Sequence, residues 1–380
     1  MTNDKPVIFN LAKARDQKAY SRLISLGAIR HLSDYYKEQE KEFFAICNPT
    51  LVYGGEFDKK FGDYWRALEK KSSVTKQGRW AYFPWISTAS HILEDKSFQR
   101  VRTARNRVLI SEEEQDKFYN SIIGIAGLSV GNSVALSIVL QGGGRHIKLA
   151  DHDKLALSNT NRVRAGVDNL GLEKVLMTAR QIYLLNPYSR IEIYKDGITK
   201  KNIKKFFDGL DIVIDEIDNI AVKYLIRQEA KSHKIAVVMA ADNGDNAVVD
   251  VERYDQNPNL EFFHGRLGKV SYDELTKLDK FGIGRTITKH IGPENVTDRM
   301  KESLLLMGKT IVSWPQLGGA ALLNGSAAAY CVRKVLNDQV VINNRALVSL
   351  DELLIPDYNS NSEKEKRHKS IDEFKRMFGL

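Results

Sequence analysis

The sequence predicts an α/β protein with a Rossmann-like, doubly wound and mainly parallel sheet, preceded by a largely helical extension. Two observations support this fold class. Short apolar runs alternate with segments of helical periodicity from about residue 120 onward, a pattern typical of a parallel sheet covered on both faces. In addition, a glycine-rich stretch directly follows the first of these runs.

Each expected strand is a short apolar run at the start of a βα unit. The runs are Ser121–Ile125, His146–Ala150, Arg190–Tyr194, Asp211–Asp215 and Ile235–Ala240. Helical spacing follows them, first in the apolar stretch Val134–Leu140 and last in the small-residue stretch Asn324–Leu336. These elements place the sheet domain at residues 101–355, apart from an insert at about 257–310 that has no such pattern.

The two ends of the chain differ from this central domain. Residues 1–100 are expected to be mainly helical, because apolar residues recur at helical spacing over Ala19–Phe44. This region also contains an aromatic group large enough for a small core: Trp65, Trp80, Tyr82, Phe83 and Trp85. Residues 356–380 form a charged tail whose composition is typical of loosely ordered segments.

Composition limits the classes of protein to consider. With 43% hydrophobic and 28% charged residues, the chain of 380 residues has enough apolar material for a large core. The first residues include acids and bases where a signal peptide needs an apolar stretch, and no apolar run approaches the roughly 18 to 20 residues of a membrane span. We therefore expect a cytoplasmic protein without a membrane partner. Its net charge of +9 favours anionic partners.

Cysteine usage excludes two further classes of site. Cys47 and Cys331 are the only cysteines, too few for a disulfide framework or a four-thiolate zinc site, and the chain has no C-x-x-C pair. We expect no zinc. Cys331 lies in an Ala-rich helical stretch, where small buried cysteines are common. Both cysteines are therefore interpreted as structural.

The glycine-rich stretch Gly124–Gly131 (GIAGLSVG) lies between the first strand and the following helix. Glycines there let the backbone approach phosphate groups, and the helix N-terminus supplies partial positive charge. Gly124, Gly127 and Gly131 are the expected cofactor-binding glycines. A turn without a ligand would contain the same glycines, but Asp151 ends the second strand at about the distance where a carboxylate meets a ribose hydroxyl. The combination indicates an adenine nucleotide.

The residues that follow resemble one family. The segment Asp151–Arg162 (DHDKLALSNTNR) is similar to the D-x-D-x-V-x-x-S-N-L-x-R segment of ThiF, MoeB and the adenylation domains of ubiquitin E1 enzymes, the HesA/MoeB/ThiF adenylyltransferase family. Further elements continue the resemblance in the same order: Lys174, Asn186–Pro187, Asp215–Asn219 (DEIDN) and Pro315–Gly319 (PQLGG). The resemblance covers about residues 100–340.

This resemblance implies an enzyme that binds ATP and Mg²⁺ and transfers AMP to a substrate carboxylate, releasing pyrophosphate, without a thioester cysteine. It assigns catalytic roles to Arg107, Arg162, Lys174 and Asp218, with Asp218 as the Mg²⁺ ligand. Such a reaction brings a carboxylate and phosphate groups together. Cationic side chains, and a metal held by one or two carboxylates, would reduce the repulsion between these anions. The other cofactor-binding residues that it implies are Ser158, Asn159, Asn161 and Asn219.

Departures from the family leave alternatives open. The usual loop reads G-x-G-G-L-G, whereas this chain has Ala126 at the second glycine and Ser129 at the last. A nucleotide-binding protein without turnover would permit such a loop. An NAD(P)-dependent oxidoreductase would share the strand, the loop and the helix. Hydride transfer does not need Arg162, Lys174 or Asp218, and this favours adenylation.

Partners are less defined than the nucleotide. The substrate carboxylate could belong to a small protein, a peptide or a modified RNA, and we expect residues 1–100 and the insert at about 257–310 to encode this choice. Arg105-Asn-Arg107 resembles the family's N-terminal arginine motif. It implies a symmetric homodimer in which Arg107 reaches the ATP of the opposite subunit.

Overall fold

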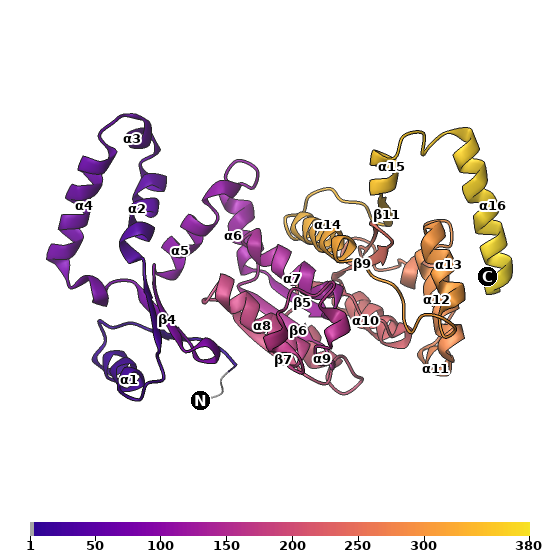
Figure 1. Cartoon of the computed structure of the whole chain (residues 1–380), viewed down its shortest axis with the longest axis horizontal. Coiled ribbons are helices and arrows are strands. Elements are labelled where there is room, and N and C mark those ends of the chain that lie inside the picture. The colour runs from indigo at the N-terminus through magenta and orange to yellow at the C-terminus, as the bar shows by residue number, and fades with distance from the viewer. Residues whose placement is uncertain (1–3) are drawn as a thin grey trace. The chain divides into compact units, whose positions relative to one another are not determined.

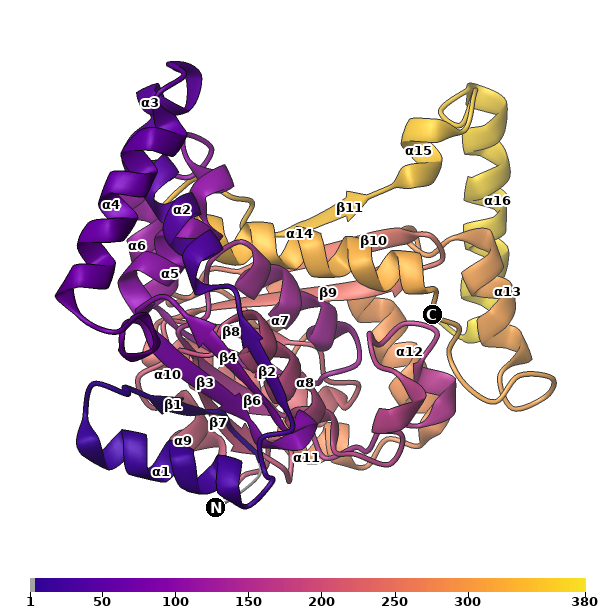
Figure 2. The same ribbon diagram turned by 60° about the vertical axis from the view of Figure 1, so that its left-hand side comes forward.

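A computed structural model describes residues 4–380, which form two compact units. Of these residues, the first unit contains 4–115 and 179–189, and the second contains 116–178 and 190–380. Helix α8 (Lys174–Leu185) begins in the second unit and continues into the first. Figures 1 and 2 show the elements of each unit. None of the helices in the described range combines the length and the apolar composition that a membrane span requires.

The first unit is built on a four-stranded sheet in the order β1-β3-β4-β2. Its strands are β1 (Val7–Phe9), β2 (His31–Asp34), β3 (Arg79–Phe83) and β4 (Thr88–Ile92). Its helices include α1 (Ala14–Ser25), α2 (Tyr36–Cys47), α3 (Pro49–Tyr53), α4 (Phe57–Lys71) and α5 (Asp95–Arg102). β3 pairs antiparallel with β1 and β4, whereas β2 pairs with β4 in parallel.

This unit is less helical than the sequence periodicity indicated. The stretch Ala19–Phe44, expected as one helical segment, contains the end of α1, strand β2 and most of α2. Trp80, Tyr82 and Phe83 lie buried in β3, and aromatic residues favour strands. The interpretation of the aromatic group as a core is confirmed, except that Trp85 is only half-buried.

The second unit contains the predicted doubly wound sheet, with seven strands in the order β11-β10-β9-β8-β5-β6-β7. The strands are β5 (Ile122–Ala126), β6 (His146–Ala150), β7 (Arg190–Tyr194), β8 (Ile212–Asp215), β9 (Ala236–Asn243), β10 (Asn246–Glu252) and β11 (Arg345–Val348). β5 to β9 pair in parallel, whereas β10 and β11 pair antiparallel. Each predicted strand is present, and β9 continues past its expected end.

Helices cover both faces of this sheet (Figure 2). α7 (Val130–Leu140) and α14 (Gly318–Leu336) pack on one face, and α9 (Ile203–Phe207) and α10 (Ile220–His233) pack on the other. α7 is apolar and almost entirely buried because α14 covers it. The remaining helices are α6 (Glu112–Asn120), α11 (Tyr272–Thr276), α12 (Lys280–Ile291), α13 (Asp298–Leu306), α15 (Leu350–Leu354) and α16 (Asn361–Phe378).

The C-terminal tail is ordered, contrary to the expectation from its charge. α16 begins after Ser360, whose side chain caps its first turn, and Phe374 is buried in a cluster with Met300 and Leu304. Phe374 and Phe378 stack with their ring centroids 5.0 Å apart. Composition concealed this helix because apolar residues four apart form a narrow stripe on an otherwise charged surface.

Candidate nucleotide-binding site

Three loops meet where the strand order of the seven-stranded sheet reverses. The loop after β5 contains Gly127–Ser129, the loop after β6 begins with Asp151, and the loop after β8 contains Glu216–Asn219. β5 lies between β6 and β8 and runs parallel to both, so the three loops leave the same edge of the sheet. In doubly wound sheets, this reversal creates a crevice that binds ligands.

A cavity of about 370 Å³ occupies this position. Its lining includes five residues that the sequence predicted: Gly127, Asp151, Lys174, Asp218 and Asn219. Apolar side chains contribute as well: Leu128, Ile198, Ile217 and Val222. The volume is typical of small-molecule and cofactor sites, and the combination of apolar wall and charged groups suits a nucleotide.

The predicted glycines are present for different structural reasons. Gly127 adopts a φ of +86°, and a Cβ there would lie 2.3 Å from the carbonyl oxygen of Glu216, so only glycine fits. Gly124 in β5 and Gly131 in α7 face buried side chains instead, and neither lines the cavity. Packing accounts for both, and their contact with a nucleotide stays a prediction.

Asp151 fixes the glycine loop to the end of β6. Its Oδ2 accepts the backbone N–H of Leu128 at 2.6 Å, and its Oδ1 accepts the backbone N–H of Asp153 at 2.7 Å. The residue is buried, although it borders the cavity. Both carboxylate oxygens therefore have a backbone donor, and the predicted contact with a ribose would use their remaining lone pairs.

Ser158, Asn159 and Asn161 shape the turn that precedes Arg162. Asn159 Oδ1 accepts the backbone N–H of Ala156 at 3.0 Å, and the carbonyl oxygen of Ser158 accepts a hydrogen bond from Arg162 Nη1 at 3.1 Å. Asn161 Oδ1 accepts a second bond from the same nitrogen at 3.0 Å. None of these three residues lines the cavity, so their predicted contact with a nucleotide stays a prediction.

Arg162 itself reaches the glycine loop. Its Nε donates to Ser129 Oγ at 3.0 Å, and Ser129 lines the cavity although Arg162 does not. Burial lowers the pKa of the Arg162 guanidinium, while the charges of Asp242 and Asp218 oppose this shift. The side chain stays cationic because arginine does not deprotonate in proteins. One arginine is thus held between the glycine loop and two acidic neighbours.

Lys174 begins α8 and pairs with an acid that the sequence analysis did not assign. Its Nζ donates to Asp153 Oδ2 at 2.9 Å, and its side chain is only 6% exposed. Burial opposes the ionisation of Asp153, but the hydrogen bond and charge of Lys174 hold the pKa of Asp153 below its ordinary value. The D-x-D spacing at the start of Asp151–Arg162 was the signal that could have identified Asp153.

Asp218 borders the cavity without a partner of its own. Within residues 4–380 no hydrogen bond or ion pair engages its carboxylate. The surrounding protein raises the pKa of Asp218 by burial, while the charges of Lys223, Lys174 and Arg162 oppose this shift. A carboxylate that borders a polar cavity and lacks a protein donor fits a Mg²⁺ ligand.

Two more carboxylates near Asp218 were missed by the sequence analysis. Glu216 lines the cavity and accepts the backbone N–H of Ala240 at 2.8 Å, and burial raises its pKa well above the ordinary value. Asp242, at the end of β9, accepts a hydrogen bond from Gln316 at 2.9 Å, and burial raises its pKa as well. Glu216 could have been noticed inside the DEIDN run, whereas nothing near Asp242 marked it.

One group of three potential metal ligands occurs within residues 4–380. The ligand atoms of Asp151, His152 and Asp153 lie within 4.8 Å of one another. However, backbone donors engage both oxygens of Asp151, and Lys174 neutralises Asp153. These contacts explain the proximity of the side chains without a metal.

Asn219 and Arg107 complete the predicted set. Asn219 Oδ1 accepts the backbone N–H groups of Ala221 and Val222 and thereby caps α10, and Asn219 also lines the cavity. Arg107 is exposed and belongs to the first unit, whereas the cavity belongs to the second. Its contact with a nucleotide stays a prediction.

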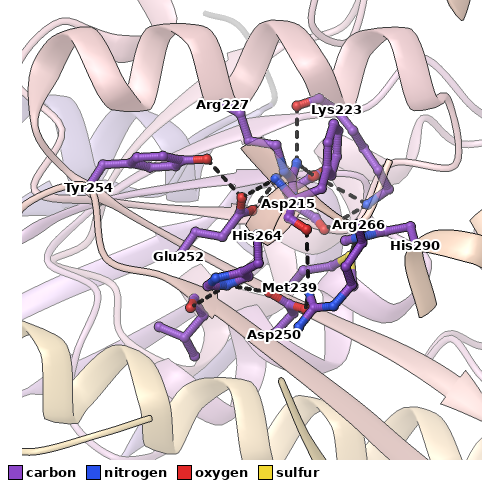
Figure 3. Close-up of polar contacts among 12 residues, drawn as sticks. Asp215, Lys223, Arg227, Met239, Asp250, Glu252, Tyr254, His264, Arg266 and His290 are labelled. Atoms are coloured by element: carbon purple, nitrogen blue, oxygen red, sulfur yellow. Dashed lines mark hydrogen bonds and ion pairs between the residues drawn. The ribbon is translucent and has the colours of Figure 1, made fainter. Parts of the chain in front are cut away.

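A buried network of charges surrounds Asp215, the first acid of the DEIDN run (Figure 3). Arg227 lies 2.5 Å from Asp215 through Nη1 and 2.7 Å from Glu252 through Nε, and none of these three side chains is more than 1% exposed. Lys223 Nζ lies 3.2 Å from Asp215, and the Arg227 guanidinium stacks 4.3 Å above the ring of Phe263. The network joins β8, α10, β10 and the segment after β10.

Comparisons with known proteins show which proteins this chain is similar to. The first relative, an uncharacterized protein of Mycobacterium tuberculosis, is 35% identical over 290 residues, covering 76% of this chain and 40% of that protein. A tRNA threonylcarbamoyladenosine dehydratase of Bacillus subtilis is 29% identical over 44% of this chain and 68% of its own length. A probable molybdopterin-synthase adenylyltransferase of Porphyra purpurea is 23% identical over 62% of this chain and 60% of its own. This chain therefore spans less than half the length of the first relative.

The sheet order, the glycine loop and the cavity at the reversal point define a Rossmann-type protein with a nucleotide-sized site. Residues 103–281 match the model of the ThiF family. The chain therefore contains a ThiF family domain, as its resemblance to that family predicted. This domain includes the glycine loop, Asp151, Arg162, Lys174 and Asp218.

Proposed function

We propose that this chain binds Mg·ATP in its ThiF domain and transfers AMP to a substrate carboxylate. The observation that carries this proposal is the cavity at the strand-order reversal, which brings Gly127, Asp151, Lys174 and Asp218 together. The name of the Porphyra relative, an adenylyltransferase, supports the same type of reaction. In this reaction a carboxylate oxygen forms a bond to the α-phosphorus, and the bond to the leaving pyrophosphate breaks.

The proposed roles follow from charge. Attack of one anion on another requires neutralisation and positioning more than covalent help from the protein. Arg162 would present a planar fork to the phosphate oxygens, and Lys174 would supply a compact charge. Asp218 would hold Mg²⁺, which adds positive charge at the phosphates when it is bound. Asp151 would meet the ribose.

The acyl adenylate would pass to a nucleophile other than a cysteine of this chain. Cys331 is buried, and burial raises the pKa of its thiol to about 11, so the thiolate needed for attack is scarce at neutral pH. Cys47 is exposed but belongs to the first unit, outside the ThiF match. We therefore propose an external acceptor rather than a thioester.

A nicotinamide-dependent oxidoreductase is the competing proposal, because it shares the strand, glycine loop and helix. Hydride transfer has no use for Lys174 near Asp218, a carboxylate without a partner in the described part of the chain, nor for an arginine fixed to the glycine loop. A nucleotide-binding protein without turnover is the third proposal, since the loop departs from the family pattern. The contact of Ser129 with Arg162 favours a working loop instead.

The substrate carboxylate stays open within one chemical class. The names of the relatives refer to a modified tRNA and to molybdopterin synthase. We propose a carboxylate on a modified RNA, a small protein or a peptide, selected by the first unit and by the segment at 257–310. A cytoplasmic location stays a prediction from the sequence.

Two measurements test this function. We expect Mg·ATP to raise the melting temperature of the full chain, because a ligand that binds only the folded state stabilises it, and we expect NAD to have no effect. Exchange of labelled pyrophosphate into ATP should then appear only when the correct carboxylate is added. Equal stabilisation by NAD would contradict the adenylation proposal, and Mg·ATP binding without exchange for any carboxylate class would favour the non-catalytic alternative.

A homodimer with Arg107 acting across the interface is proposed from the family resemblance. Mixing Arg107→Ala chains with Asp218→Asn chains tests it, because each mixed dimer would contain one intact site if the arginine acts in trans. Random pairing at equal amounts should restore about a quarter of wild-type activity, if the sites are independent. No recovery in demonstrably mixed dimers, or a monomer by light scattering, would reject the assignment.

A further inference from the structure

Arg162 is held along one side of its guanidinium group. Nε donates to Ser129 Oγ at 3.0 Å, and Nη1 donates to the Ser158 carbonyl oxygen at 3.1 Å and to Asn161 Oδ1 at 3.0 Å. Nη2 has no acceptor in the part of the chain that the structure describes. The guanidinium is planar, so fixing two of its nitrogens also fixes the direction of the third.

Ser129 has an unusual relation to the helix that follows it. It is the N-cap residue of α7, a position where a serine hydroxyl ordinarily accepts a backbone N–H of the first turn. Its side chain makes no such cap bond. The hydroxyl accepts the Arg162 Nε–H instead. Helix capping therefore does not explain the serine, and the contact with Arg162 does.

The segment that contains Arg162 is anchored on its other side by the start of α14. Asn161 Nδ2 donates to the Gln316 carbonyl oxygen at 2.7 Å, and Gln316 Nε2 donates to the buried Asp242 at 2.9 Å. A Cβ on Gly318 would lie 2.4 Å from the carbonyl oxygen of Asn161, so the two backbones approach closely. Arg162 thus lies between two anchors, one at Ser129 and one at Gln316.

We propose that Ser129 is a positioning residue whose hydroxyl holds Arg162 so that Nη2 faces the phosphate groups of the nucleotide. This inference rests on the proposed ATP site. It gives the departure from the usual glycine loop a specific purpose, because glycine at this position would offer no side-chain acceptor to the arginine.

The expected loss of ATP affinity follows from the cost of ordering the Arg162 side chain. Without the Ser129 hydroxyl, the Nε side of Arg162 loses its acceptor, and binding must order the side chain at a cost in affinity. The Asn161 and Ser158 contacts would remain, so the loss should be modest. We expect Ser129→Ala to weaken Mg·ATP binding about three- to tenfold, within the range for one hydrogen bond of ordinary strength.

Isothermal titration of the full chain tests this with two probes, Mg·ATP and adenosine. Adenosine has no phosphates, so its affinity should not change in Ser129→Ala. Ser129→Thr keeps the hydroxyl and should restore binding of Mg·ATP. Thr160→Ala is the matched control, because the Thr160 hydroxyl lies in the same segment and donates only to the Leu157 carbonyl oxygen.

A double-mutant cycle with Arg162→Ala shows whether the loss of Mg·ATP affinity in Ser129→Ala depends on Arg162. If Ser129 acts through Arg162, Ser129→Ala causes no further loss of Mg·ATP affinity in the Arg162→Ala background. An equal loss in both backgrounds, or no loss in the wild-type background, would overturn the proposal. Failure of the wild-type chain to bind Mg·ATP would instead reject the proposed function.

A measurement without nucleotide distinguishes failure of the Ser129 proposal from failure of the proposed ATP binding. In arginine-labelled protein, the Nε–H signal of Arg162, assigned with Arg162→Lys, should be protected from solvent exchange and should lose that protection in Ser129→Ala. Rapid exchange of this proton in the wild-type chain would overturn the positioning role, whatever the outcome for ATP.

Discussion

Asp215 and Asp218 lie three residues apart in one motif, yet their surroundings differ. Asp215 is fully buried, and the charges of Lys223 and Arg227 outweigh that burial and hold its pKa below the ordinary value. Asp218 borders the cavity, has no partner within the described residues, and has a pKa raised by burial. The comparison separates an acid that organises the fold from an acid available for chemistry.

The two environments also differ in what they connect. The network of Asp215 links Arg227 and Glu252 (Figure 3). The Arg227 guanidinium also stacks on Phe263, which lies in the segment after β10. Phe263 has a φ of 57°, which is strained for an aromatic residue and persists only where its surroundings fix it. The buried network thus pairs its charges with one another, whereas the Asp218 carboxylate has no hydrogen bond or ion pair within residues 4–380.

The largest expected effect is the loss of a buried cation. Within residues 4–380, Arg227→Met would leave the buried Asp215 with Lys223 as its ion-pair partner and the buried Glu252 with no ion pair, and removing one partner of a buried ion pair costs about 3–5 kcal/mol. Urea denaturation followed by circular dichroism measures this loss. Lys366→Met is the matched control, because its partner Glu363 is exposed and such pairs contribute about 0–1 kcal/mol. Equal losses in the two variants would contradict the structural role of the network.

Asp218→Asn should show the opposite behaviour. Its carboxylate has no partner within residues 4–380, and burial raises its pKa, so the uncharged amide should not lower the free energy of unfolding at neutral pH and is expected to raise it slightly. Pyrophosphate exchange should nevertheless fall about a hundredfold or more, because Mg²⁺ would lose its ligand beside the phosphates. Normal turnover of the variant at limiting Mg²⁺ would show that the metal role is wrong.

The sequence predicted the parallel sheet well, because each strand is a short apolar run next to a periodic helix. It did not predict the four-stranded sheet of the first unit, where β2 (HLSD) has neither an apolar run nor alternation that would mark a strand. It also missed α16, whose buried Phe374 is one apolar residue among many charges. In both cases tertiary packing, rather than local pattern, determined the structure.

At the site, too, the sequence identified individual residues but not the contacts between residues far apart in the chain. Motif resemblance identified Lys174 and Asp218, which line the cavity, because their types recur in a fixed order. It did not identify Asp153 as the partner of Lys174, nor Ser129 as the acceptor for Arg162. Those contacts join residues 21 and 33 positions apart, so only the folded chain reveals them.

Glu216 lies between Asp215 and Asp218 in the sequence, and the pH dependence of stability tests its environment. Because burial raises its pKa above the ordinary value of 4.5 in the folded chain, the unfolded chain releases this proton first as the pH rises. Stability is therefore lost between about pH 4.5 and the raised folded value, and the loss is complete above it. Glu216→Gln removes this penalty and can still accept the Ala240 N–H. We expect it to match the wild type at pH 4 and to be more stable than the wild type at pH 8. Melting temperatures of the two proteins, measured from pH 4 to pH 8, test this. A constant difference between them across that range would refute the raised pKa of Glu216.

The smallest expected effect comes from the cysteines, which test whether burial alone marks a reactive group. Cys331 is buried, and burial raises its pKa to about 11, but it lies in α14 and does not line the cavity. The double variant Cys47→Ala/Cys331→Ala should keep pyrophosphate exchange within about twofold of the wild type, since the proposed nucleophile belongs to the substrate. A small loss of stability is expected from the buried position, and circular dichroism would detect it. If pyrophosphate exchange disappears while the fold persists, a cysteine takes part in adenylation. A residue outside the cavity would then be needed for the reaction.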